Sequence, residues 1–314
     1  GPVVVQQALR GLVPGGKPIA CALPGTALGI GLEIPLACHR IFAADNPKAK
    51  IGLPEILVGI FPGAGGTTRL SRKLGAMGAS PLLLEGKLND PMKAKAAGVV
   101  DYPIGATMAS GWNLGQEFVN LYPGFGGVMF NDDNTTAVNS DAGLKALDVM
   151  KKTLAYTDPE VLVSDSTYVQ QQFQQGKIAM SNLWASRGGA MDDAAESSVV
   201  GKVRMAAAPM AMDGGAPATT LWWDGIVIAS NISDEEADAA FRLAMEGMDE
   251  EMVKANNGAA IWLIKGYEPG PLAEGAIATA TATPAAPAYP STTVMGLLHT
   301  ALGNELPAYL TGER

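Results

Sequence analysis

The sequence predicts an α/β protein made of two units that differ in composition. Residues 1–100 hold 11 Lys or Arg and 5 Asp or Glu, whereas residues 101–314 hold 11 and 26. All five Trp and all seven Tyr follow residue 100, and both Cys precede it. A single domain rarely sorts its residues in this way, so we infer two units of different origin. The alternative is uneven usage within one fold.

Composition also excludes several classes of protein. With 47% hydrophobic residues the chain can bury a sizeable core. It has no run of 18 apolar residues, so we expect no membrane span. Its first residues lack a secretory pattern, which predicts a cytoplasmic location as written. Without basic patches interleaved with aromatic residues, nucleic acid is not an expected partner. Cys21 and Cys38 lack metal-ligand spacing, so we predict free buried thiols, with a disulfide as the alternative, and no metal site.

The first predicted unit spans residues 1–103, followed by a junction at 104–110. "KPIACALPG" predicts a short strand and a turn, and "GLEIPLACHRIFAA" a helix start and a second apolar run. "AKIGLPEILVGIFPGAGGTTRLSRKLG" predicts a strand, a carboxylate-bearing turn, a glycine-rich loop and a basic helix. The last helix of this unit is expected to open at Asp90 and Pro91.

The second predicted unit spans residues 111–314. Ser140 is expected to cap a helix whose apolar side carries Leu144, Leu147, Met150 and Leu154. The clearest helix runs from Ser233 to Met252, with a capping box in "SDEE" and one apolar stripe. Strands are predicted in "KIAMSNLW", "VRMAAAPM" and "TTLWWDGIVIAS".

Two carboxylates in the first unit suggest acid–base chemistry. "GIGLEI" lacks the third glycine of a dinucleotide-binding loop, but a backbone N–H at a helix start can stabilise an oxyanion. Glu33 follows that N–H by three residues, and Glu55 lies 22 residues further on. On successive turns, the two carboxyl groups can hold one water between them as acid and base. His39 is predicted to be structural.

"KPIACALPGTALGIGLEIPLACHR", "AKIGLPEILVGIFPGAGGTTRL" and "LLEGKLNDPMKAKAAGVVD" resemble the enoyl-CoA hydratase (crotonase) family, most of all the hydratase part of bifunctional fatty-acid oxidation proteins. The resemblance covers about residues 5–102. It implies that Glu33 and Glu55 add water across an enoyl double bond, and that the Ile30 N–H is one of two donors to the thioester oxygen.

This sequence departs from the crotonase pattern at two points. Ile30 stands where the family has glycine, which puts a Cβ where the backbone approaches the thioester. The family's other oxyanion donor comes from a turn further upstream, and "GPVVVQQALRGLVPGG" contains nothing like it. Losing one such donor costs about 10²–10³ in rate. A truncated ββα unit with impaired activity is therefore expected.

The second unit offers aromatic side chains rather than a nucleophile–base pair. Aromatic faces stack on the apolar faces of sugar rings, while Asp, Asn and Gln bind the hydroxyl groups; the alternative is that the tryptophans belong to the core. "GGVMFNDDNTTAVNSDAGLKALDVMKKTL", "QQFQQGKIAMSNLW" and "WWDGIVIASNISDEEADAAFRLAMEG" resemble the second half of sugar-type extracellular solute-binding proteins of ABC importers. The likeness covers about residues 110–314 and implies one α/β lobe of a periplasmic-binding-protein-like fold. Its implied ligand-binding residues are Gln116, Trp184, Trp222, Trp223 and Asp224.

The combination predicts a chimera of a partial hydratase and a truncated binding lobe. We favour sugar binding as the substrate-binding component of an ABC transporter. The transporter's permease would be the partner, and the family that the second unit resembles is periplasmic. The alternative is an enoyl-CoA hydratase of fatty-acid β-oxidation, which uses a coenzyme A thioester as substrate and needs no cofactor. The sequence leaves open whether the chain is an enzyme.

Overall fold

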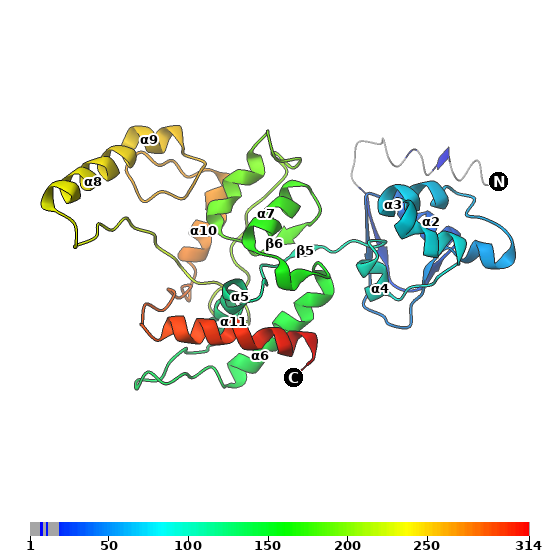
Figure 1. Ribbon diagram of the computed structural model, residues 1–314, viewed down its shortest axis with the longest axis horizontal. Helices are drawn as coiled ribbons and strands as arrows, with labels where there is room; N and C mark the ends of the chain where they lie inside the picture. The colour runs from blue at the N-terminus through cyan, green and yellow to red at the C-terminus, as the bar shows by residue number, and fades with distance from the viewer. Residues whose placement is uncertain (1–6, 9–10, 12–18, 314) are drawn as a thin grey trace. The chain divides into compact units, whose positions relative to one another are not determined.

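The computed structural model describes residues 7, 8, 11 and 19–313, without the side chains of residues 271 and 272, and it has the predicted mixed α/β content (Figure 1). The chain divides into two compact units. The first ends at Pro103 and also takes in Ala155–Pro159, while the second contains Ile104–Leu154 and the chain from Glu160 onward.

Short parallel strand pairs organise the first unit. Strand β1 pairs with β3, and β2 pairs with β4. Parallel pairs need a crossover between their strands, and here short helical turns supply it. In chain order these elements are β1 (Ala20–Leu23), β2 (Ala27–Leu28), α2 (Ile30–Glu33), η1 (Pro35–Ala37), β3 (Arg40–Ala43) and β4 (Ile51–Gly52).

The rest of the first unit is helical. The elements are η2 (Pro54–Val58), α3 (Gly66–Leu84) and α4 (Pro91–Ala96). Gly75, with φ of +72°, interrupts α3, and Pro91 opens α4 behind an Asp90 cap that accepts the Lys93 N–H at 2.8 Å. The predicted helix start is therefore confirmed. The core beneath these helices includes the fully buried Leu32, Ile51, Leu53 and Leu70.

A later segment of the chain, Ala155–Pro159, forms hydrogen bonds with the rest of the first unit. Lys95 Nζ donates to the Ala155 carbonyl at 3.2 Å, and the Tyr102 hydroxyl donates to Asp158 at 3.0 Å. Burial lowers the pKa of Lys95, and the charge of Asp158 opposes that shift. Cys21 and Cys38, also in this unit, are free thiols as predicted but only partly buried.

The core of the second unit lies where α5 packs against α6 and α11, with the fully buried Leu114, Val119, Met150 and Met295. The only two-stranded pairing among the described residues of this unit is β5 with β6, in parallel. In chain order the elements are β5 (Ile104–Gly105), α5 (Trp112–Gly124), α6 (Asp141–Thr153), η3 (Leu154–Tyr156, which enters the first unit at Ala155), η4 (Val161–Val163), α7 (Ser166–Gln174), β6 (Met180–Ser181), η5 (Ala185–Asp192), α8 (Asp234–Gly247), α9 (Glu250–Ala255), α10 (Pro271–Ala280) and α11 (Met295–Thr311).

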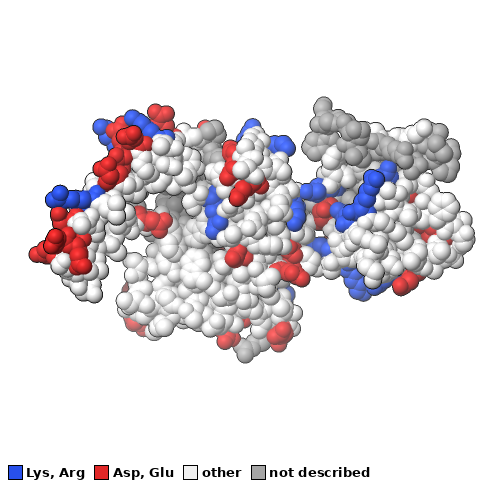
Figure 2. All heavy atoms as spheres, turned by 45° about the horizontal axis from the view of Figure 1, so that its top comes forward, with Lys and Arg blue, Asp and Glu red and all other residues white. Residues whose placement is uncertain are grey.

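The two predicted helix caps of the second unit are present, but the faces behind them differ from the prediction. Ser140 accepts the Gly143 N–H, and Ser233 forms a capping box with Glu236. On α6, however, Leu144 is 65% exposed and Ala146 faces the core instead. The predicted long helix is broken at Met248 into α8 and α9, and no residue of α8 is buried. Figure 2 shows acidic and basic side chains interleaved over these two helices.

Three predicted strands are wrong in extent. "KIAMSNLW" contains only the two-residue β6, and "VRMAAAPM" forms no strand. In "TTLWWDGIVIAS" only Leu221 makes an isolated bridge, to Ala288. A strand needs a neighbour to satisfy its backbone N–H and C=O groups, and residues 222–232 find none among the described residues. Their apolar side chains are consequently exposed, Val227 to 91%.

Candidate functional site

The first candidate site begins with Glu33, the last residue of α2. Its side chain is 2% exposed, and its Oε1 atom accepts N–H groups from Ala64 at 2.9 Å and Gly66 at 2.7 Å. A Cβ on Gly66 would come within 2.8 Å of the Glu33 side chain. The loop before α3 therefore needs glycine here so that its backbone can bind the carboxylate.

Glu55 lies in the first turn of η2, behind Pro54. Its Oε1 atom is 3.1 Å from the point where a Cβ on Gly29 would stand, and its buried Oε2 atom has no partner among the described residues. Burial raises the pKa of Glu55; a backbone hydrogen bond opposes the shift, and the charge of Glu33 adds to it. The two carboxyl groups interact electrostatically, and one of them is disposed to keep its proton, which suits an acid–base pair.

Ile30 opens α2 and is 50% exposed. The first N–H groups of a helix have no intrahelical acceptor, so the Ile30 N–H is free to face an incoming oxygen. The crotonase resemblance implies a second donor, but the sequence before Ile30 offers no turn that could supply it, and before residue 19 the structure describes only Gln7, Ala8 and Gly11.

The second candidate site is an aromatic cluster of Trp112, Trp184 and Trp222, called here the Trp cluster. Trp112 and Trp184 are stacked with ring centroids 6.0 Å apart, and Trp222 meets both edge-on at 6.0 and 5.5 Å. Trp112 begins α5, Trp184 precedes η5, and Trp222 follows the Leu221 bridge. Trp112 and Trp222 are 47% and 41% exposed, so part of each residue is open to solvent.

Two further side chains support the Trp cluster: His299, on α11, and Tyr289, in the loop before that helix. The His299 ring stacks on Trp112 at 4.8 Å, and Tyr289 packs on Trp222 at 4.2 Å. His299 Nε2 lies 2.7 Å from the Trp112 carbonyl, which can only accept, so Nε2 carries the proton. Nδ1 then accepts the Tyr289 hydroxyl at 2.8 Å. Burial lowers the pKa of His299, which keeps the ring neutral.

Gln116, one turn after Trp112, supplies the polar side of this site. Its Nε2 donates to Asn120 at 2.8 Å and Thr220 at 3.0 Å, and Trp222 Nε1 donates to the same Thr220 oxygen at 2.9 Å. The Gln116 Oε1 atom is buried without a partner among the described residues. An unpaired buried acceptor carries a free-energy cost that a ligand hydroxyl can remove.

The structure thus brings Gln116, Trp184 and Trp222 together but leaves two other predicted residues apart from them. Trp223 is 74% exposed and stacks on none of the cluster rings, and Asp224 is exposed beside it. Sequence reasoning did not assign Trp112, Tyr289 or His299 to the site. No local signal could have done so, because His299 meets Trp112 across 187 residues of chain.

Glu117, beside Gln116 on α5, is a further buried acid. It accepts a hydrogen bond from the Thr107 hydroxyl at 2.5 Å. Burial raises its pKa to about 7, against the opposing effect of that hydrogen bond. Among the described residues no cluster of three or more His, Cys, Asp or Glu could hold a metal ion. No described helix is long and apolar enough to cross a membrane.

Residues 87–245, just over half of the chain, match the sequence model of the bacterial extracellular solute-binding proteins. The chain belongs to this family. An ABC transporter solute-binding protein from Agrobacterium radiobacter K84, solved in complex with ribitol, aligns with 79% of this chain and 60% of its own. The TM-score is 0.57 at 22% identity, and this likeness confirms the predicted solute-binding fold.

In this member of the solute-binding family, residues 4–107 also match the sequence model of enoyl-CoA hydratase/isomerase. Fatty acid oxidation complex alpha subunits of Shewanella halifaxensis (strain HAW-EB4) and Vibrio campbellii (strain ATCC BAA-1116) are 44% and 45% identical over 84 residues. That stretch is 27% of this chain and 12% of either relative. Both resemblances inferred from the sequence are confirmed, and the matched ranges overlap at residues 87–107, around α4 and β5.

Proposed function

We propose that the second unit binds a sugar or sugar alcohol through the Trp cluster. The observation that carries this proposal is the convergence of three tryptophan rings next to Gln116, whose Oε1 atom is unpaired among the described residues. Aromatic faces bind the C–H surface of a polyol, and a buried acceptor pairs with one hydroxyl. The ribitol bound to the Agrobacterium radiobacter protein supports the same ligand class. Trp223 and Asp224 would reach such a ligand only from the edge of the cluster.

The proposed role is that of the substrate-binding component of an ABC importer, with the permease as partner. Because the first hundred residues match a different family, we expect fewer ligand contacts than in a two-lobed binding protein. Losing about 4 kcal/mol would turn micromolar binding into roughly millimolar binding. Millimolar affinity is therefore expected for this chain.

Tryptophan fluorescence during titration with ribitol and with monosaccharides tests the proposal. All five tryptophans lie in the second unit, and Trp184→Ala or Trp222→Ala should weaken the response. Trp262→Phe is the matched control, because the Trp262 indole binds the Asn256 carbonyl away from the cluster. A response that persists in both cluster variants and disappears in the control would refute the site.

A second candidate function, hydration of a 2-enoyl-CoA, is favoured by the Glu33 and Glu55 geometry. Glu33 is held by backbone N–H groups, and Glu55 has a raised pKa, as an acid–base pair requires. Only the Ile30 N–H stands ready as an oxyanion donor among the described residues, so we expect marginal turnover. Hydration of crotonyl-CoA should be slow and should disappear in Glu33→Gln and Glu55→Gln. Robust turnover would contradict the expected impairment, and turnover that survives both changes would contradict the site.

A further inference from the structure

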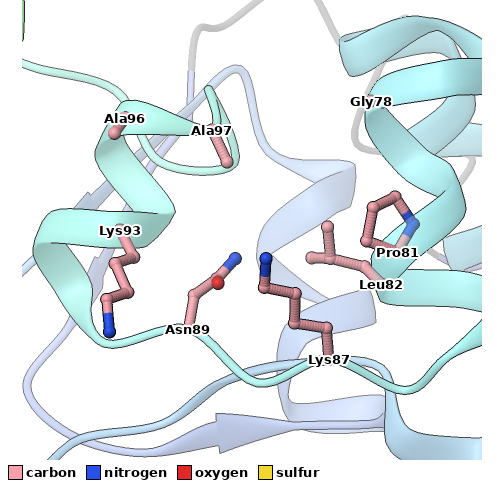
Figure 3. A pocket seen from close by; sticks show the side chains of 8 residues that line it. All are labelled: Gly78, Pro81, Leu82, Lys87, Asn89, Lys93, Ala96 and Ala97. Atoms are coloured by element: carbon pink, nitrogen blue, oxygen red, sulfur yellow. The ribbon is translucent and has the colours of Figure 1, made fainter.

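A cavity of about 360 Å³ lies in the first unit. Helix α3, helix α4 and the turn that joins them surround it (Figure 3). Neither Glu33 nor Glu55 lines it. Its volume is within the range of small-molecule sites in proteins. The lining residues are Gly78, Pro81, Leu82, Lys87, Asn89, Lys93, Ala96 and Ala97.

Asn89 is the polar centre of this cavity. Its backbone is fixed by a bridge to Ile51, with N–H to carbonyl distances of 2.9 and 2.8 Å. The residue is only 3% exposed, no described residue forms a hydrogen bond with its carboxamide, and water can still reach that group from the cavity. Figure 3 shows the side chain directed into the space between the helices. A ligand oxygen in the cavity can take the place of that water and accept a hydrogen bond from the amide.

The charge beside Asn89 is positive and only partly neutralised. Lys93 forms an ion pair with Asp90 at 3.4 Å, whereas no described residue accepts a hydrogen bond from Lys87 Nζ. Figure 3 shows Lys87 extending toward Asn89. The turn is held in place, because the Lys87 N–H donates to the Pro81 carbonyl at 3.0 Å and Gly86 adopts a φ of +64°. One unpaired ammonium and one amide N–H₂ therefore face the same space.

We propose that this cavity binds an organic monoanion, a carboxylate with a short alkyl body. The two carboxylate oxygens would accept from Lys87 Nζ and Asn89 Nδ2. The alkyl part would lie against Pro81, Leu82 and Ala97, which have no polar side-chain atoms. A phosphate dianion fits less well, because a single uncompensated charge and apolar walls favour one negative charge joined to a hydrophobic group.

Hexanoate is the probe that tests this proposal, titrated into the full ¹⁵N-labelled chain by NMR. The Asn89 side-chain amide and the Gly86 backbone amide should shift with about millimolar affinity, the strength expected of eight non-hydrogen atoms. Lys87→Gln should weaken binding about tenfold, since a charge-assisted hydrogen bond is lost. Ala97→Leu should abolish it by filling the cavity. Lys48→Gln is the matched control: an exposed lysine of the same unit, outside the cavity.

Two further probes test the charge and the alkyl body of the ligand separately. Hexylammonium has the same body with the opposite charge and should not bind, and inorganic phosphate should bind more weakly than hexanoate. The proposal is overturned if hexanoate shifts none of these amides, if Lys87→Gln binds as tightly as Lys48→Gln, or if hexylammonium competes. Phosphate binding equal to that of hexanoate would also overturn it, because the apolar walls would then contribute nothing.

Discussion

The carboxyl site of the first unit and the Trp cluster of the second are assembled in different ways. Glu33, Glu55 and Gly66 lie within one short stretch of chain, and backbone N–H groups hold the central carboxylate. The Trp cluster gathers side chains from residue 112 to residue 299, and ring contacts and side-chain hydrogen bonds hold it. A local site can be recognised from a motif, whereas a long-range site depends on the packing of the whole unit.

The largest effect should come from Glu117, the buried acid next to Gln116 on α5. Because folding raises the pKa of Glu117 to about 7, its stabilising contribution is complete below the unfolded value near 4.5 and is lost as pH rises through 7. Glu117→Gln removes this dependence. Between pH 4.5 and pH 8 the variant should gain on the order of 3 kcal/mol relative to the parent chain. Urea unfolding at the two pH values measures the gain.

If the stability of Glu117→Gln relative to the parent chain is the same at pH 4.5 and pH 8, Glu117 is solvated in the folded chain. The packing around α5 would then be looser than the Trp cluster requires.

Gly66→Ala tests the backbone-held site of the first unit. The new Cβ would stand 2.8 Å from the Glu33 side chain, so the loop must move and the unit should lose about 1–3 kcal/mol. Gly31→Ala is the control in the neighbouring helix α2, where nothing lies within 4 Å, and it should stabilise by about 0.5–1 kcal/mol. Hydrogen exchange of first-unit amides measures both. Equal effects of the two changes would show that the loop does not need its glycine.

The same contrast explains what the sequence could and could not predict. The caps at Asp90, Ser140 and Ser233 were predicted correctly, because a cap depends on residues three positions apart. The strands at 203–210 and 219–230 were not, because a strand forms only where a distant neighbour is available. The family resemblance suggested three residues of the Trp cluster site, Gln116, Trp184 and Trp222. No feature of the sequence pointed to Tyr289 and His299, because their contacts also depend on distant parts of the chain.

Tyr289→Phe is expected to have a smaller effect, on the side chains that support the Trp cluster. Removing the hydroxyl leaves His299 Nδ1 buried without its donor, which costs about 1 kcal/mol. Tyr267→Phe, in the same unit, makes the same chemical change away from the cluster and should cost less. Thermal unfolding followed by tryptophan fluorescence compares the two. A larger loss for Tyr267→Phe would show that the His299–Tyr289 contact does not support the cluster.

The smallest effect should come from Ser233→Ala at the capping box of α8. A lost N-cap weakens a helix by about 1 kcal/mol, but α8 buries no residue, so the change should fray this helix and leave the unit's melting temperature nearly unaltered. Circular dichroism reports the lost helicity. A clear drop in melting temperature would show that α8 is packed against the rest of the unit.

The most direct test of the account is the set of five indole N–H signals in a ¹⁵N NMR spectrum during titration with ribitol. The Trp cluster assignment predicts shifts at Trp112, Trp184 and Trp222, a smaller one at Trp223, and none at Trp262. Coenzyme A thioesters should leave all five unmoved. Shifts at Trp223 and Trp262 with the cluster signals unchanged would contradict the claim that this cluster carries the binding function.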